Sequence, residues 1–346
     1  MFDSKNVFTY LIGAAVIITG SYLATQYKKS LDPNDEYDLI KKYLLNESPL
    51  YGYNRPKIWI HSKYEVNSRK WKSFYSRNST DLNQPYIHLT IKTIINHCGS
   101  HFNICLIDDE SFSKLIPSWD VNLTTMSEPM KSHFRQLGLA QLIYYYGGMV
   151  VPDSFCCIKN LDDFYKEGVS GNRPFFCEAN NRTVDTMNQK RRYLFLPDMY
   201  FMGALKNDSY VLELVEYLKK ICRDPHFSSQ VDFKGSISNW LLDSHKNQRV
   251  NLVGGEVIGV KTADRKPILL DNLMEEEFLN VHDSLVGIYI PEDEILIRPK
   301  FQWFAVLPSE QILQTKCIIS KYLAASIADS VNEYYKKSEI RSVVSL

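Results

Sequence analysis

The segment from Phe134 to Leu161 constrains the fold of this chain more than any other stretch. Apolar residues recur at helical spacing up to Tyr146, a Gly-Gly pair follows, and the short apolar run Met149–Val151 ends two residues before Asp153. This order predicts a helix that stops at Gly147 in a left-handed C-terminal cap, and then a buried strand. Because ligands of open α/β sheets bind beyond the carboxyl ends of the strands, Asp153 is a candidate site residue.

Two more strands and a helix are predicted before that segment. Lys57–His61 and Phe102–Ile107 are apolar runs of strand length, and Thr90–Cys98 between them has helical spacing. The second run exits into the pair Asp108-Asp109. The order strand, helix, strand predicts a parallel βαβ unit, so the fold class is α/β.

The rest of the chain extends this domain, which we place at residues 56–346. Pro197–Gly203 predicts another strand, and Asp208 or Ser209 caps a following helix. Residues 168–194 have the composition of a loop-rich insertion, and residues 309–335 predict one C-terminal helix. The inner face of the helix after Asp208 is predicted to consist of apolar residues at helical spacing: Val211, Leu214, Val215, Leu218 and Cys222.

The N-terminal region predicts a membrane anchor. Residues 7–27 are apolar and free of charge, which is long enough for one bilayer crossing. The preceding tail, residues 1–6, is not clearly basic, so a retained anchor is favoured over a cleaved signal peptide. Residues 28–55 are a polar stalk, and Lys28 and Lys29 slightly favour a cytosolic globular domain over a lumenal one.

Composition excludes one class of partner and bears on the compartment. Lysine plus arginine equals aspartate plus glutamate at 40 each, so a basic nucleic-acid-binding face is not expected. The seven cysteines lack metal-ligand spacing, and Cys156 and Cys157 are adjacent. Reduced, structural thiols favour a cytosol-facing domain, and a lumenal domain with one or two disulfides is the alternative.

Arg135 shares a helical stripe with Leu139, Leu142 and Tyr146. A buried guanidinium is costly unless it is paired, and its planar fork suits a phosphate or a carboxylate. Two interpretations follow. Arg135 either clamps a ligand phosphate, or it forms a structural ion pair with an aspartate.

Several other polar or aromatic residues are candidates with a structural alternative. Asp153 could hold Mg²⁺ or Mn²⁺ through oxygen, or it could be an exposed turn residue. Asp109, with Asp108, could line the same crevice or cap a helix. His61 could serve the site or only a structural hydrogen bond. Asp198 could be an acceptor-side carboxylate, and Trp303 could cover a pocket or pack in the core.

The pattern Arg-x(10)-Tyr-Gly-Gly, from Arg135 to Gly148, resembles the glycosyltransferases with a DxD sugar-binding motif. That group includes yeast initiation-type mannosyltransferases, capsular polysaccharide synthesis enzymes and, distantly, clostridial glucosylating toxins. Three other stretches between Pro56 and Leu218 also resemble the family: Pro56–His61 as its opening strand, Lys159–Leu161 as its motif tail, and Phe201–Ala204 as a later strand.

The resemblance implies a GT-A-like, Rossmann-type mixed sheet, a nucleotide-sugar donor, a Mn²⁺ or Mg²⁺ cofactor and often a single N-terminal anchor. In that reading Arg135 binds the diphosphate, and Asp153 binds the metal or the sugar hydroxyls. The implied donor-binding residues are Trp59, His61, Asp109, Tyr146, Gly147, Gly148 and Trp303. The chain departs from the family where Pro152 and Ser154 stand at the two motif aspartates, and where Ser132 replaces the aspartate before the arginine.

Three functions are therefore weighed. The first is a membrane-anchored glycosyltransferase with a glycan, lipid or protein acceptor that approaches from the side of residues 168–194. The second is a catalytically inactive GT-A-fold protein that acts as a binding or scaffold module on a membrane. The third is a phosphohydrolase with Asp108 or Asp109 as the nucleophile.

Overall fold

The computed structural model describes residues 55–62, 84–179, 195–223 and 230–328. The chain divides into two compact units, residues 1–46 and 47–346, and all of the first unit lies outside the described residues. The predicted anchor at 7–27 and almost all of the predicted stalk therefore lie outside them too. Within the described ranges, no helix is both long enough and apolar enough to cross a bilayer.

The main sheet has six strands in the order β2-β1-β3-β6-β5-β7. β1 pairs parallel with β2 and with β3, whereas β6 runs antiparallel to β3 and β5. β5 and β7 are parallel. The predicted α/β class with a mixed sheet is confirmed. The strands span β1 Lys57–His61, β2 Asn103–Ile107, β3 Gly148–Val150, β5 Phe175–Glu178, β6 Pro197–Ala204 and β7 Asn251–Val253.

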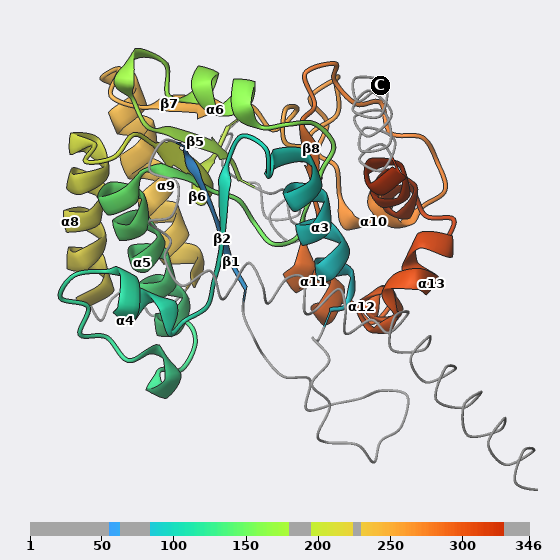
Figure 1. Ribbon diagram of the computed structural model, residues 1–346, viewed down its shortest axis with the longest axis horizontal. Coiled ribbons are helices and arrows are strands. Elements are labelled where there is room, and N and C mark those ends of the chain that lie inside the picture. Colours follow the sequence, from blue (N-terminus) through green and yellow to red (C-terminus); the bar gives the residue numbers. More distant parts are fainter. Residues whose placement is uncertain (1–54, 63–83, 180–194, 224–229, 329–346) are drawn as a thin grey trace, which may run out of the picture. The chain divides into compact units, whose positions relative to one another are not determined.

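Two crossovers in opposite directions organise the first half of the sheet. The chain passes from β1 through α3 (Tyr86–Cys98) to β2, and from β2 through α5 (Met130–Tyr146) to β3 on the other side of β1. Because such crossovers are right-handed, α3 and α5 cover opposite faces of the sheet. Figure 1 shows α5 and α3 on either side of β1 and β2. The strand order reverses at β1, so the topological switch point lies between β1 and β3.

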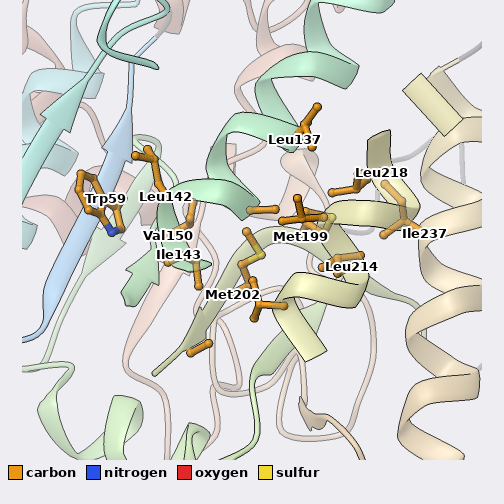
Figure 2. Close-up of a cluster of buried hydrophobic side chains, with 14 of the residues drawn as sticks. Trp59, Leu137, Leu142, Ile143, Val150, Met199, Met202, Leu214, Leu218 and Ile237 are labelled. Atoms are coloured by element: carbon orange, nitrogen blue, oxygen red, sulfur yellow. The ribbon is translucent and has the colours of Figure 1, made fainter. Parts of the chain in front are cut away.

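A hydrophobic core lies under α5, α8 (Ser209–Arg223) and α9 (Gln230–Lys246). Figure 2 shows Trp59, Val150, Met202 and their neighbours from the sheet facing leucines and isoleucines of these helices. All five residues predicted for the inner face of α8 are buried. Asp208 caps this helix as predicted, because its Oδ1 accepts hydrogen bonds from the backbone N–H groups of Tyr210 and Val211 at 2.9 and 3.0 Å.

The two glycines after α5 set the junction between helix and strand. Gly147 ends the helix with φ +70° as predicted, but its ψ of −170° leads directly into extended chain rather than into the predicted left-handed cap. Gly148 has φ +93°, and a Cβ there would lie 2.1 Å from the carbonyl oxygen of Lys57. Only glycine therefore allows β3 to lie this close to β1.

Two predicted segments differ from the structure. Residues 168–194 are not only loop, because β5 lies within them and pairs with both β6 and β7. The predicted helix 309–335 is broken, since α13 (Ser309–Gln314) ends at an extended Thr315 and a new helical stretch begins at residue 318. The Thr315 hydroxyl contacts the carbonyl oxygen of Ile312 at 2.9 Å, a local bond that competes with helix continuation.

A second, two-stranded sheet joins β4 (Phe155–Cys157) antiparallel to β8 (Gly287–Tyr289). β4 also packs against α3. β8, which lies late in the sequence, thus fixes the position of the segment that follows β3. The remaining elements are short: α4 Ser111–Leu115, η1 Leu123–Thr125, α6 Asp162–Gly168, η2 Ser170–Asn172, α10 Leu270–Met274, α11 Glu292–Ile297 and α12 Gln302–Val306.

Candidate functional site

The strand directions bring five ionisable residues to one edge of the main sheet. β1, β2, β3 and β5 end at this edge, and the antiparallel β6 begins there. His61 ends β1, Asp109 follows β2, Asp153 follows β3, Glu178 ends β5 and Asp198 lies at the start of β6. We call this the carboxyl edge. It includes the switch point between β1 and β3, where open α/β sheets bind ligands.

A cluster of paired charges, the Arg135 cluster, occupies the α5 side of the carboxyl edge. It consists of His61, Asp109, Glu128, Lys131 and Arg135. Arg135 donates from Nε and Nη2 to the two carboxylate oxygens of Asp109 at 2.7 Å each, and from Nη1 to Glu128 at 3.2 Å. Asp109 also lies 3.0 Å from His61 Nε2 and 3.6 Å from Lys131 Nζ. The structure thus contains the structural ion pair that was one interpretation of Arg135.

The electrostatics of this cluster favour the ionised form of Asp109. Burial alone would raise the pKa of Asp109, but hydrogen bonds from His61 and Arg135 and their positive charge outweigh it. They hold the pKa of Asp109 well below its usual range. The Arg135 side chain is only 6% exposed, whereas Lys131, one helical turn earlier, is 21% exposed. Lys131 is therefore the more accessible cation for an anionic ligand.

Sequence reasoning missed Lys131 and Glu128. Lys131 lies four residues before Arg135 on α5, and this spacing places the two on the same helix face. That spacing is the signal in the sequence that could have identified it. Glu128 precedes α5 in an irregular segment, so no periodic pattern indicates that it contacts Arg135.

The predicted donor-binding residues near the Gly-Gly junction lie mainly inside the protein. Trp59 is fully buried, and its indole N–H donates to the carbonyl oxygen of Gly147 at 3.0 Å. Its ring contacts that of Tyr146, whose hydroxyl donates to the Leu115 carbonyl at 2.7 Å. Trp59 and Tyr146 thus hold β1, β3 and α5 together. The Trp59 ring is part of the core, and its place among the donor-binding residues stays a prediction.

A second group, the Tyr86 cluster, lies on the α3 side of the carboxyl edge. It consists of Tyr86, Thr90, Asp153 and Ser154. Tyr86 begins α3, and the Thr90 hydroxyl of the same helix donates to the backbone carbonyl of Asp153. Burial, followed by the negative charges of Glu292 and Asp153, raises the pKa of Tyr86. Asp153 is buried, so it is not the exposed turn residue of the alternative interpretation. Asp153 and Arg135 therefore belong to different sides of the switch point.

Two hydroxyls near Asp153 are buried without a hydrogen-bond partner in the described part of the chain. They are Tyr86 Oη and Ser154 Oγ, and both residues are almost completely buried. Tyr86 also packs against Phe304 with ring centroids 5.1 Å apart. A buried hydroxyl without a partner costs about 1–3 kcal/mol, so these two atoms are exceptions that a bound molecule could satisfy.

The remaining carboxylates of the edge face lysines. Glu178 is buried and accepts hydrogen bonds from the Gly255 backbone N–H at 2.8 Å and from Lys261 Nζ. Burial raises the pKa of Glu178, and Lys261 opposes that shift. Asp198 Oδ2 lies 3.6 Å from Lys234 Nζ. The sequence had identified Asp198 but not Glu178, because Glu178 fell within the predicted insertion.

The other predicted site residues are placed as follows. Asp108 accepts hydrogen bonds from the backbone N–H and hydroxyl of Ser111 at 2.9 and 2.6 Å, so it satisfies the first N–H group of α4, although Glu110 is the N-cap residue. His61 stacks on Phe112 with centroids 5.4 Å apart, which fixes its ring beside Asp109. Trp303 is 41% exposed on α12 rather than packed in the core.

The residues available to a divalent cation are few. Among the described residues, no three His, Cys, Asp or Glu side chains come together as a metal site. Mg²⁺ sites near phosphates often use only one or two carboxylates, with water and phosphate oxygens as the other ligands. One buried carboxylate, Asp153, fits only this weaker kind of site.

The structure is weakly similar to two solved glycosyltransferase structures. No family model and no curated protein matches the sequence. The apo-form glycosyltransferase GlyE of Streptococcus pneumoniae matches with a TM-score of 0.41 and 10% identity, over 82% of this chain and 64% of GlyE. The PaToxG glycosyltransferase matches with a TM-score of 0.28 and 12% identity, over 62% of this chain and 83% of PaToxG. The chain spans less than two thirds of GlyE, and similarity at this level does not establish a shared fold.

Proposed function

We propose that this chain is a membrane-anchored glycosyltransferase of GT-A architecture. It moves a sugar from a nucleoside-diphosphate sugar to a glycan, lipid or protein acceptor. The observation that carries the proposal is the set of charged side chains at the carboxyl edge, on both sides of the switch point between β1 and β3. The Arg-x(10)-Tyr-Gly-Gly pattern also supports the proposal, because it covers α5 from Arg135 onward and the glycine junction between α5 and β3.

The two sides of the edge take different parts of the donor. Lys131 and Arg135 supply positive charge to the diphosphate, and the diphosphate competes with Asp109 for them. Asp153 and Tyr86 bind the sugar hydroxyls, and Asp153 is the carboxylate for Mn²⁺ or Mg²⁺. When bound, that cation would neutralise charge on the leaving diphosphate. Asp198 and Glu178 lie on the acceptor side of the same edge.

The proposal places the domain on a membrane through residues 7–27. Lys28 and Lys29 directly after this segment favour the cytosolic side. A fusion of a topology reporter to the C-terminus, in cells that express the full chain, tests the orientation. Reporter activity on the lumenal side would contradict the cytosolic assignment but not the transfer of sugar.

A donor-hydrolysis assay on the full-length chain with Mn²⁺ and common UDP- and GDP-sugars tests the reaction. Asp153→Asn is expected to lower hydrolysis about 100-fold, in line with the loss of a metal or sugar ligand. Asp163→Asn is the matched control, because Asp163 is an exposed residue of α6. Equal activity of Asp153→Asn and the unaltered chain would remove Asp153 from the site.

A specific observation favours a second candidate, a catalytically inactive GT-A-fold protein that binds ligands or partners on a membrane. The Arg135 guanidinium already has carboxylate partners on both sides, and Pro152 and Ser154 stand where the family has its acids. Donor binding without hydrolysis in calorimetry would support this candidate. Absence of both binding and hydrolysis for every common UDP- and GDP-sugar would defeat the glycosyltransferase and would leave the second candidate without a nucleotide-sugar ligand.

A further inference from the structure

Two cysteines that are far apart in the sequence meet between α3 and β4. Cys98 is the last residue of α3 and Cys157 the last residue of β4, and their sulfur atoms lie 3.9 Å apart. Both residues are completely buried. We propose that Cys98 and Cys157 form a disulfide when the chain folds in the presence of a small-molecule disulfide oxidant, and that this bond ties α3 to β4.

Two hydrogen bonds hold the backbone of Cys157 in place. The Cys157 N–H donates to Thr93 Oγ1 of α3 at 2.9 Å, and the Cys157 carbonyl accepts from Ser326 Oγ at 2.6 Å. A disulfide needs the sulfur atoms about 2.05 Å apart, so each sulfur has to move by about 1 Å. The elements that carry the two cysteines already pack against each other, since α3 contacts β4 and Thr93 of α3 accepts a hydrogen bond from the Cys157 N–H.

The structure singles out this pair among the seven cysteines. All seven lie in the described residues, and all are free thiols. Cys156, the immediate neighbour of Cys157, is equally buried, but side chains alternate between the two faces of a strand. The sulfur of Cys98 is therefore next to Cys157, and Cys156 is a matched control.

The timing of oxidation follows from burial. Burial, followed by the neighbouring thiol of Cys98, raises the pKa of Cys157, and only a thiolate attacks a disulfide. The folded, reduced protein is therefore expected to react slowly. During folding the thiols are still accessible, so we expect the bond to form at that stage.

Glutathione disulfide is a sufficient oxidant. One cysteine loses its proton, and its thiolate attacks a sulfur of glutathione disulfide and releases one glutathione thiolate, which is then protonated. The second cysteine thiolate attacks the protein sulfur of the mixed disulfide and releases the second glutathione. The chain loses two protons and two electrons in total, and glutathione disulfide gains them and becomes two molecules of glutathione.

The bond would stiffen the support of the carboxyl edge. α3 holds the turn at Asp153 through Thr90, and β4 begins two residues after that turn. A bond between α3 and β4 closes a loop between residues 98 and 157 that contains α5 and β3. It therefore restricts the unfolded chain and fixes the distance between α3 and the strand that follows Asp153.

Oxidative refolding of the full-length chain tests the proposal. The chain is unfolded and reduced, then refolded in detergent with a mixture of reduced and oxidised glutathione, alkylated and digested. Mass spectrometry is expected to find a Cys98–Cys157 linked peptide, and Ellman titration in denaturant five reactive thiols in place of the seven in a parallel sample refolded without oxidant. Seven reactive thiols after oxidative refolding, or a linkage between other cysteines, would overturn the proposal.

Variants separate this pair from the general reactivity of thiols. Cys98→Ser and Cys157→Ser should each abolish the linkage, whereas Cys156→Ser should retain it. If a variant fails to fold, the peptide analysis of the unaltered chain still decides. The linked form is expected to melt about 5–10 °C above the reduced form. A melting temperature at or below that of the reduced form would contradict the fit of the bond to this geometry.

Discussion

The two sides of the switch point differ in whether their buried polar groups have partners. On the α5 side, the Arg135 cluster surrounds Asp109 with Arg135, His61 and Lys131. On the α3 side, the Tyr86 cluster leaves the hydroxyls of Tyr86 and Ser154 without partners in the described residues. Closed networks stabilise the fold, and unsatisfied groups destabilise it unless a ligand binds. The α5 side thus mainly supports the fold, and the α3 side is better suited to a ligand.

The largest effect is expected at the junction that both sides share. Gly148→Ala places a Cβ against the backbone oxygen of Lys57 at a residue with φ +93°, and should destabilise the chain by more than about 4 kcal/mol. Gly235→Ala in α9 is the control, because nothing lies within 4 Å of its added Cβ, and it should stabilise by about 0.5–1 kcal/mol. Urea denaturation measures both. A loss below 1 kcal/mol for Gly148→Ala would show that β3 can move away from β1.

The next effect tests whether the Arg135 cluster is a structural pair. Arg135→Met leaves Asp109 without its bidentate partner and should destabilise the fold by about 3–5 kcal/mol. The double variant Arg135→Met/Asp109→Leu removes both charges and should be more stable than Arg135→Met alone. Denaturant midpoints of the two variants make the comparison. If the double variant were less stable than the single one, the pair would not be what stabilises this side.

The pH dependence of stability distinguishes the two sides further. The pKa of Asp109 is lowered in the folded state, so its contribution is present above the ordinary aspartate pKa and is lost as the pH falls through the folded pKa. The unaltered chain should therefore lose stability below a pH of about 4, and Asp109→Asn should lose about 2 kcal/mol less over the same range. Denaturation at pH 7 and at acidic pH gives both values. If the unaltered chain and Asp109→Asn lost the same stability between pH 7 and acidic pH, the contribution of the Asp109 carboxylate to stability would be contradicted.

The smallest effects on stability are expected on the α3 side. Tyr86→Phe and Ser154→Ala each remove a hydroxyl that has no partner in the described residues, so each should change stability by less than about 1 kcal/mol or increase it. Both should weaken donor binding if these hydroxyls contact the sugar. Thr90→Val is the contrasting control, because its hydroxyl donates to Asp153, and it should destabilise by about 1 kcal/mol. Calorimetric titration with the donor, paired with urea denaturation, separates binding from stability.

Much of the fold follows from local patterns in the sequence. β1, β2 and β6 are apolar runs bounded by polar or turn residues, and α8 has a cap followed by an apolar stripe. β5 was not predicted because its four residues show no alternation, and the stretch around them is rich in glycine, asparagine and charged residues, which favours a loop. The helix break at Thr315 was not predicted because it depends on a side-chain hydrogen bond rather than on a helix-breaking residue.

The candidate site could be predicted only in part, because sequence proximity does not decide which groups pair. Asp109 and Arg135 were both candidates, but the bidentate contact between them depends on how α5 lies against the loop that follows β2. Trp59 was a donor-binding candidate, yet β1 is buried on both faces and Trp59 lies in the core. Asp153 and Arg135 were both candidates, and each contacts a different crossover helix, because Asp153 accepts a hydrogen bond from Thr90 of α3 whereas Arg135 lies on α5.

The pairing of β4 with β8 has a consequence for synthesis on the ribosome. Phe155 pairs with Tyr289, and the Ile290 N–H donates to the Ser154 carbonyl right beside Asp153. The nascent chain reaches Asp153 long before it reaches Ile290, and at typical elongation rates the delay is on the order of ten seconds. During that interval the six-stranded sheet can assemble most of its strands, but the turn at Asp153 still lacks the strand that braces it. Translation must pass Ile290 before this part of the protein acquires its final shape.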